Sequence, residues 1–303
     1  MDAPSIEIKN LSKQYDASTT YALKNLTLTV KAGEVYGFLG PNGAGKSTTI
    51  RLLMNFIRPT EGSAQIHGLD TQKDSVAVKQ SIGYLASDPG LYQEMTGNQY
   101  LDYMEELQLT TNPTYRRELI QRLRAEPQKR LRTLSRGNKQ KFGIIQAFMH
   151  QPRLLILDEP TSGLDPLMQE VFYELIHEAK QRGASAFISS HILSEVQKTC
   201  DRVGIIKSGQ LVSEQSVTEI THKAEQLFHI TFASTPPVDQ LNKVLGLHII
   251  THKGNELTIK IHGDLAPLFS VLSEHTVLKL YTRHPDLEDI FMDFYREDQE
   301  DTI

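Results

Sequence analysis

A glycine-rich segment near the N-terminus has the residue types and the spacing of a phosphate-binding loop. It matches the pattern G-x-x-x-x-G-K-[ST] and lies between a short apolar run and a segment of helical character. In such a loop, backbone N–H groups cradle phosphate oxygens, the lysine reaches the β- and γ-phosphates, and the last hydroxyl coordinates Mg²⁺. The candidate phosphate-binding residues are Gly40, Pro41, Asn42, Gly43, Ala44, Gly45, Lys46, Ser47 and Thr48, with Lys46 also a catalytic candidate and Ser47 a candidate metal ligand.

Two adjacent carboxylates follow a second apolar run. Residues 154–157 read Leu-Leu-Ile-Leu and are followed by Asp158 and Glu159. Ligands of open α/β sheets bind at the carboxyl ends of the strands. We therefore expect Asp158 to hold Mg²⁺, partly through water, and Glu159 to polarise an attacking water as a general base.

Three further motifs follow in order along the chain and give these residues a family context. Residues 134–138 read Leu-Ser-Arg-Gly-Asn, residues 162–165 read Ser-Gly-Leu-Asp, and residues 189–191 read Ser-Ser-His. They resemble the signature, the D-loop and the H-loop of ABC ATPases. On these motifs, residues 1–224 are identified as an ABC ATP-binding cassette.

The resemblance implies that ATP is the bound nucleotide and that two cassettes pack head to tail. Ser135 and Gly137 of one protomer are then expected to meet the γ-phosphate held by the other, at a helix N-terminus that favours an anion. His191 is expected to contact the γ-phosphate and orient the attacking water, and Asp165 to couple the two sites. Because one chain contains both halves of the composite site, a homodimer is chemically sufficient, although a heterodimer is possible. ATP binding would close the dimer and hydrolysis would reopen it.

An aromatic residue after the first expected strand is the candidate for stacking on adenine. The family places such a residue where Tyr15 stands, and stacking needs only a π-face. Tyr21 is the competing candidate, because residues 16–20 lengthen this loop.

The motifs also depart from the family pattern. Arg136 and Asn138 replace the usual signature residues, and we expect them to change contacts without removing Ser135 and Gly137. Ser87 stands where the family usually has a glutamine, and its side chain is too short to reach the metal as a glutamine would. Asp88 could act through water, so the role of this loop stays open.

The elements that must position these motifs alternate between strands and helices. This alternation predicts an α/β fold with a mostly parallel sheet. Residues 5–9 and 26–30 alternate like half-buried strands and belong to an antiparallel β subdomain, and a helix is expected over residues 46–57. Helical periodicity from about residue 88 to 150 predicts an inserted helical subdomain. The other strands are expected at residues 34–39, 64–67, 82–85, 154–157, 184–189 and 203–206.

The last part of the chain differs in charge and pattern. Residues 225–303 contain 6 Lys and Arg against 13 Asp and Glu, so this segment carries a net charge of −7. Residues 1–224 must then carry +2 to give −5 for the whole chain. Its element order, βαββαβ, predicts a small α+β domain with a ferredoxin-like split fold, which ends in an amphipathic helix through Leu287, Ile290, Phe291 and Phe294. Residues 286–291 resemble the end of cassettes that serve type 2 exporters.

Composition limits where the chain can work. Its 303 residues suggest about two domains, and no apolar run approaches the roughly 18 residues of a membrane-spanning helix. The N-terminus has no secretory signal pattern, and the single cysteine, Cys200, fits a reducing cytosol. We therefore expect a cytoplasmic protein, peripheral on the inner face of the cell membrane through a separate transmembrane permease that exports drugs, peptides or other envelope cargo.

A rival interpretation is a soluble ABC ATPase that acts on nucleic acid or ribosomes. Residues 116–141 hold ten Lys and Arg against two Glu, which could attract an acidic partner. Solvated helix faces are often charged, however, and such relatives usually carry two cassettes or a long coiled-coil insertion. His248, His252 and His262 fall in one expected hairpin without a complete zinc-ligand set, so we expect surface histidines rather than a metal site.

Overall fold

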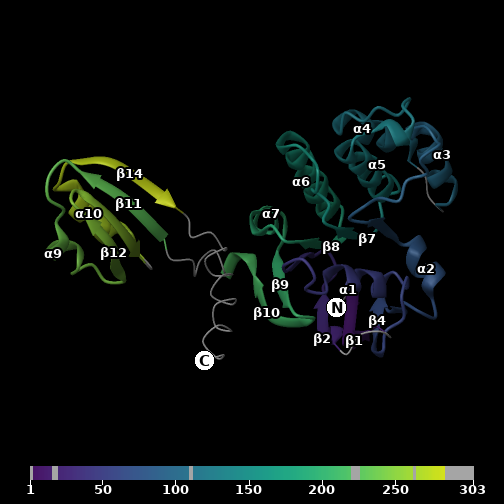
Figure 1. Ribbon diagram of the computed structural model, residues 1–303, viewed down its shortest axis with the longest axis horizontal. Coiled ribbons are helices and arrows are strands. Elements are labelled where there is room, and N and C mark those ends of the chain that lie inside the picture. Colours follow the sequence, from purple (N-terminus) through teal and green to yellow (C-terminus); the bar gives the residue numbers. More distant parts are fainter. Residues whose placement is uncertain (1–2, 16–19, 109–111, 220–225, 262–263, 284–303) are drawn as a thin grey trace. The chain divides into compact units, whose positions relative to one another are not determined.

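A computed structural model describes residues 3–15, 20–108, 112–219, 226–261 and 264–283 of the protein. The chain forms two compact units, which divide between Val217 and Thr218. The boundary expected near residue 224 lies outside the described residues. Each unit is described by itself (Figure 1).

A six-stranded sheet in the order β10-β9-β3-β8-β7-β6 forms the centre of the first unit. Its strands are parallel except for β10, which pairs antiparallel with β9. Every residue of β3, β7 and β8 is buried, which agrees with the apolar runs of β3 and β7 in the sequence, whereas β8 also buries three serines. The strand bounds are β3 Val35–Leu39, β6 Ile82–Leu85, β7 Leu154–Asp158, β8 Ser185–Ser190, β9 Arg202–Lys207 and β10 Gln210–Ser216.

The register of this sheet brings the functional motifs to one edge. Leu39, the last residue before the phosphate loop, pairs with Ser190, and Asp158 pairs with Ser189. Because the three strands are parallel, their carboxyl ends meet at the same side of the sheet. The phosphate loop, the two carboxylates and His191 therefore begin from neighbouring strand ends.

An antiparallel sheet in the order β2-β1-β4-β5 forms the expected β subdomain. Alternating side chains of β1 and β2, such as Ile6, Ile8 and Leu28, share one buried core with Phe38 of β3 and Ile50 of α1. The bounds are β1 Ile6–Gln14, β2 Tyr21–Val30, β4 Glu61–Ile66 and β5 Leu69–Asp70.

Four helices accompany these two sheets: α1 Lys46–Leu53, α2 Ser75–Gln80, α6 Pro166–Gln181 and α7 Leu193–Thr199. Helix α1 was expected to continue to residue 57, and that prediction is wrong at its C-terminal end. Asn55 takes a left-handed conformation (φ 49°), which ends the helix because asparagine tolerates this region better than most residues.

The inserted helical subdomain contains α3 Gly97–Glu106, α4 Pro113–Arg122, the 3-10 helix η1 Leu131–Thr133 and α5 Arg136–Phe148. Thr96 and Gln99 form a capping box at the start of α3, and Asn112 caps α4. Helices α3, α4 and α5 gather at one end of the first unit (Figure 1). Helix α5 also packs on β6, so the signature at its start is fixed to the sheet.

The second unit contains the expected βαββαβ order: β11 Gln226–Phe232, α9 Val238–Leu241, β12 Leu247–Lys253, β13 Glu256–Ile261, α10 Ala266–Ser273 and β14 Val277–Arg283. The strands form an antiparallel sheet in the order β12-β13-β11-β14. Phe228, Ile230 and Phe232 of β11 are buried with Leu268 of α10 in a separate core. The ferredoxin-like assignment stays a prediction, and the expected helix over residues 287–294 lies outside the described residues.

Among the described residues, no helix combines the length and the apolar character needed to span a bilayer.

Candidate active site

The phosphate loop follows β3 directly and ends in the first turn of α1. Gly43 (φ 83°) and Gly45 (φ 113°) take backbone conformations that L side chains rarely adopt. A Cβ added at Gly45 would lie 2.8 Å from the carbonyl oxygen of Ala22, and one at Gly40 would lie 2.5 Å from that of Ile206. The loop thus needs glycine for both conformation and space.

A pocket of about 270 Å³ opens over this loop. Seven of the nine predicted phosphate-loop residues line it, namely Pro41, Asn42, Gly43, Gly45, Lys46, Ser47 and Thr48. Gly40 and Ala44 are buried instead. Ser87 and Glu159 complete one side of the lining, so the residue at the expected glutamine position does face the phosphate loop.

The Lys46 ammonium lies inside this pocket and is only 6% exposed. Its Nζ donates to the carbonyl oxygens of Gly40 (2.6 Å) and Pro41 (3.2 Å) and lies 3.2 Å from Oε1 of Glu159. A buried cation surrounded by acceptors is suited to binding a phosphate oxygen.

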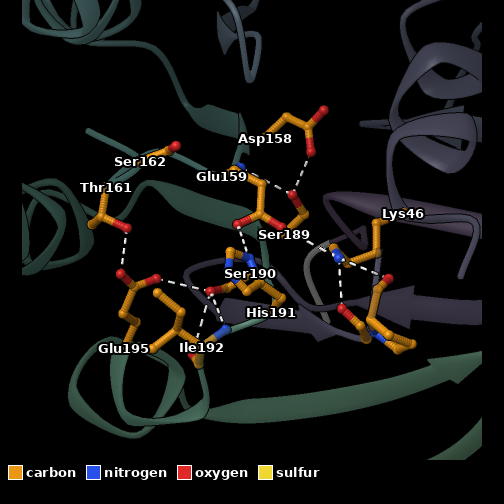
Figure 2. Close-up of polar contacts among 12 residues, drawn as sticks. Lys46, Asp158, Glu159, Thr161, Ser162, Ser189, Ser190, His191, Ile192 and Glu195 are labelled. Carbon is orange, nitrogen blue, oxygen red and sulfur yellow. Dashed lines mark hydrogen bonds and ion pairs between the residues drawn. The ribbon is translucent and has the colours of Figure 1, made fainter. Parts of the chain in front are cut away.

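Glu159 and His191 face each other across the ends of β7 and β8. Nδ1 of His191 lies 2.7 Å from Oε2 of Glu159, while Oε1 of the same carboxylate contacts Lys46. Figure 2 shows the three side chains converging. The sequence predicted each of them separately, and the structure brings them together.

The backbone of Glu159 is held in an unusual conformation. Its φ of 50° is left-handed, and its N–H donates to Ser189 at both the carbonyl oxygen (3.2 Å) and Oγ (3.1 Å). Non-glycine residues in this region carry about 1–3 kcal/mol of strain and persist only where their surroundings fix them. The strand end therefore aims the Glu159 carboxylate toward Lys46.

Asp158 precedes Glu159 and is buried at the end of β7. Its Oδ1 accepts a hydrogen bond from Oγ of Ser189 at 2.5 Å. Burial and this carboxylate together raise the pKa of Tyr84 on β6 to about 12, so that phenol stays neutral. The Ser47 hydroxyl and the Asp158 carboxylate are hard oxygen donors of the kind that Mg²⁺ prefers. Among the described residues, no group of three or more His, Cys, Asp or Glu side chains is placed to hold a metal ion.

The signature and the D-loop contact each other within this chain. Ser135 caps α5 by accepting from the N–H of Asn138 (3.3 Å), and Asp165 caps α6 in the same way. A Cβ at Gly137 would lie 2.2 Å from the carbonyl oxygen of Gly163, so the fourth signature position needs glycine. Neither Ser135, Gly137 nor Asp165 lines the phosphate pocket of the same chain.

Arg136, one of the departures from the family pattern, has a partner in the D-loop. Its Nη2 donates to Oγ of Ser162 at 3.1 Å. The arginine therefore adds a contact between the signature and the D-loop that a glycine at this position could not make.

Both candidates for adenine stacking have partly exposed rings. Tyr15 and Tyr21 are 39% and 37% exposed, and neither ring lines the phosphate pocket. The Lys13 ammonium lies 5.3 Å from the centre of the Tyr15 ring, while Ala22, the neighbour of Tyr21, does line the pocket. Residues 16–19 between them lie outside the described residues.

Sequence reasoning missed several buried polar residues around the site. Gln140 of α5 donates to the carbonyl oxygen of Pro160 (2.9 Å), and Thr161 and Ser190 both donate to the carboxylate of Glu195. Thr161 and Ser190 stand inside or beside recognised motifs, so their positions could have suggested a role. Glu195 is a single acidic residue in a short helix, and only its burial shows that it is part of this network.

The remaining sequence candidates do not form a second site among the described residues. Arg116 pairs with Asp102 and Glu105, and Arg122 pairs with three glutamates, so part of the basic stretch is neutralised within the chain. His248 and His252 are exposed, no metal cluster is found in the described part of the chain, and His262 lies outside it. Burial raises the pKa of the Cys200 thiol to about 12, which makes it unreactive near neutral pH.

Comparison with known proteins agrees with this geometry. The ABC transporter family matches residues 23–162. The bacitracin transport ATP-binding protein BcrA of Bacillus licheniformis is 34% identical over 296 residues, which cover 95% of this chain and 96% of that protein. The linearmycin resistance ATP-binding protein LnrL of Bacillus subtilis is 28% identical over 303 residues, with 95% and 97% covered.

Solved structures share the fold of the first unit. A structure described as the ATP-binding subunit of an ABC transporter is 31% identical and superposes with a TM-score of 0.66 over 71% of this chain and 91% of the other. The ATP-binding cassette MJ0796, bound to ADP and phosphate in a dimeric post-hydrolysis state, is 23% identical with a TM-score of 0.62 over 70% of this chain and 98% of the other, and it shows the fold alone. Because a relative 34% identical matches almost the full length of this chain, the chain belongs to the ATP-binding subunits of ABC transporters. These subunits are ATP hydrolases that work with separate transmembrane components.

Proposed function

We propose that this chain powers export through a separate permease by ATP-driven association of two cassettes on the cytoplasmic face of the membrane. The relatives support this proposal, because BcrA is named for bacitracin transport and LnrL for linearmycin resistance. Drug or peptide cargo is therefore the class to test first. We assign residues 1–224 to the cassette and residues 225–303 to an accessory domain.

The observation that carries the proposal is that Glu159 contacts both Lys46 of the phosphate loop and His191. Backbone N–H groups of residues 40–48 and the Lys46 ammonium would hold the β- and γ-phosphates of ATP. Glu159 would accept a proton from the attacking water. The water oxygen would bond to the γ-phosphorus while the bond between that phosphorus and the β–γ bridging oxygen breaks. His191, 2.7 Å from that carboxylate, would keep the base and the water aligned.

Magnesium fits the oxygen donors at this site. We assign Ser47 and Asp158 as its protein ligands, and nucleotide phosphates would complete its coordination. The ion would neutralise charge on the phosphate oxygens. Ser189 supports this role, because its hydroxyl hydrogen-bonds Oδ1 of Asp158 and thereby fixes the carboxylate.

The signature residues are assigned to a second copy's nucleotide. Ser135, Gly137 and Asp165 lie outside the phosphate pocket of their own chain, as a composite site between two cassettes requires. Since one chain holds both halves, a homodimer is sufficient, and a heterodimer with a related cassette would use the same residues. The ion pairs that neutralise Arg116 and Arg122 give no support to the rival nucleic-acid role.

Steady-state ATP turnover by the Glu159→Gln variant tests the hydrolytic assignment. Loss of a general base typically lowers the rate about 10²- to 10⁴-fold. We expect kcat to fall in this range while equilibrium ATP binding persists, because the phosphate loop is unchanged.

Glu170→Gln is the matched control, since Glu170 is an exposed glutamate of α6 that pairs with Lys198 at 2.8 Å. It should turn over ATP at the wild-type rate. Equal rates for Glu159→Gln and the wild type would reject Glu159 as the base.

A further inference from the structure

A buried carboxylate lies next to the candidate active site and belongs to none of its motifs. Glu195 is in α7 and is only 8% exposed. Its two oxygens accept hydrogen bonds from hydroxyls of two different loops, as Figure 2 shows. Burying a carboxylate is unfavourable unless its oxygens are hydrogen-bonded, so the two hydroxyls stabilise the buried Glu195 carboxylate.

The first hydroxyl belongs to Thr161, whose Oγ1 donates to Oε1 of Glu195. Thr161 is buried in the turn that follows Glu159. Within this turn, the N–H of Ser162 donates to the carbonyl oxygen of Glu159 (3.1 Å), and that of Leu164 to the carbonyl oxygen of Thr161 (3.0 Å). Fixing Thr161 therefore fixes the path of the chain from Glu159 toward the D-loop.

The second hydroxyl belongs to Ser190, whose Oγ lies 2.8 Å from Oε2 of Glu195 and 3.3 Å from the carbonyl oxygen of Ile192. A hydroxyl has one proton to donate, and the charged, nearer acceptor is the stronger partner. The same Oγ accepts from the N–H of Ile192 at 2.9 Å. Because Ser190 and Ile192 flank His191, this contact fixes the backbone that carries the imidazole.

The two loops meet at the reacting side chains. Glu159 and His191 are in contact at 2.7 Å on one side, and Thr161 and Ser190 are joined through Glu195 on the other. The two segments are thus in contact at two points, directly through Glu159 and His191 and indirectly through Glu195. Because a shift of about 1 Å at a catalytic group can lower a rate about 10²-fold, we expect loss of the contacts through Glu195 to slow catalysis.

We propose that Glu195 is a positioning residue for ATP hydrolysis. Its carboxylate joins Thr161 to Ser190 and so holds Glu159 and His191 at the distance that the reaction needs. This inference rests on the roles proposed for Glu159 and His191. Glu195 does not line the phosphate pocket, and ATP is bound by the phosphate loop. Its removal therefore lowers kcat and leaves the affinity for ATP unchanged.

The test compares four variants of the full chain by kcat, KM, equilibrium ATP binding and thermal unfolding. Glu195→Ala removes both hydrogen bonds, and kcat should fall about 10- to 100-fold, as when hydrogen-bond partners behind metal ligands are removed. Glu195→Gln keeps the shape, accepts at one end and donates at the other, and should restore part of kcat. Thr161→Val and Ser190→Ala each remove one hydroxyl with little change in volume, and each should lower kcat.

A double variant separates a joint role from two independent ones. If Glu195 acts through Thr161, adding Thr161→Val to Glu195→Ala lowers kcat little further, because the contact is already lost. Additive losses would mean that the two residues act separately and would overturn the proposal. Glu170→Ala, which removes an exposed glutamate, is the control for loss of a carboxylate and should match the wild type.

The outcomes distinguish this inference from the proposed function. Wild-type turnover by Glu159→Gln would reject the role proposed for Glu159, on which this inference rests. Wild-type kcat for Glu195→Ala, with Glu159→Gln inactive, would reject the role of Glu195 alone, as would a raised KM at unchanged kcat. If Glu195→Ala does not fold, wild-type kcat in both Thr161→Val and Ser190→Ala would overturn the proposal.

Discussion

At the scale of single residues, Glu159 shows how backbone and side chain act together. Its left-handed φ of 50° and the two contacts of its N–H with Ser189 fix the turn at the end of β7. The carboxylate is consequently held between Lys46 and His191. The sequence predicted a base at this position, but not the strained backbone that aims it.

A prediction at the residue scale concerns the stacking of Tyr15 on adenine. Replacing Tyr15 by alanine should weaken ATP binding, since stacking on an aromatic ring contributes about 1–3 kcal/mol per base. Tyr15→Phe should bind as the wild type, because a phenyl ring keeps the π-face. Equilibrium titration with ATP measures both.

Tyr21→Ala is the control for this prediction, as its ring is similarly exposed, at 37% against 39%. Weaker binding by Tyr21→Ala, with unchanged binding by Tyr15→Ala, would transfer the stacking role to Tyr21.

At the scale of elements, the phosphate loop joins β3 to α1 through backbone conformations that few residues adopt. Gly45 has a φ of 113°, and a Cβ there would lie 2.8 Å from the carbonyl oxygen of Ala22. The N–H of Gly40 also donates to the carbonyl oxygen of Ser190 at 3.2 Å, which ties the loop to the end of β8. The geometry of the loop therefore depends on its neighbours as well as on its own glycines.

Replacing Gly45 by alanine tests this dependence. We expect the free energy of unfolding to fall by about 2 kcal/mol or more, because both the backbone conformation and the contact with Ala22 become unfavourable. ATP binding should be lost, since Gly43, Gly45 and Lys46 line the phosphate pocket. Denaturant unfolding and ATP titration measure the two effects.

Gly33→Ala is the matched control, because Gly33 has a φ of 72° but no atom within 4 Å of an added Cβ. Its free energy of unfolding should fall by only about 1 kcal/mol, with ATP binding retained. If the free energy of unfolding falls equally in the two variants, the close approach of the added Cβ at residue 45 to the Ala22 carbonyl oxygen has no effect.

At the scale of the whole molecule, the residues that we propose to bind nucleotide fall into two groups. Lys46 and Glu159 line the phosphate pocket, whereas Ser135 and Gly137 lie at the start of α5 and outside its lining. A chain with both groups can complete the site of an identical copy.

Mixing two inactive variants tests the proposed homodimer. Lys46→Ala damages phosphate binding and Ser135→Arg blocks the signature, so each variant alone should have little ATPase activity. A mixed dimer contains one site with both residues intact, and the mixture should regain activity above that of either variant. Turnover is measured as a function of the mixing ratio at constant total protein.

A mixture no more active than its components would contradict a homodimer with composite sites, provided that each variant retains the thermal stability of the wild type. A mixture of Lys46→Ala with Lys46→Met serves as the negative control, because no pairing of these chains restores a complete site.

The sequence by itself determined the chemistry and much of the cassette. Apolar runs identified β3 and β7, because a strand covered on both faces needs apolar residues, and β6 has the predicted bounds. The glycine, lysine and carboxylate types at fixed spacing identified the phosphate loop and the candidate general base. Helix α1 was predicted too long because the left-handed Asn55 has no distinctive pattern in the sequence.

Only the tertiary structure decided which residues meet. Lys46, Glu159 and His191 are separated by more than thirty residues between each pair, and they converge because β3, β7 and β8 are neighbours in a parallel sheet. Glu195 is recognisable only by its burial and its two hydroxyl donors. Sequence spacing specifies local conformation, whereas contacts between distant residues follow from the strand order and register that the whole unit adopts.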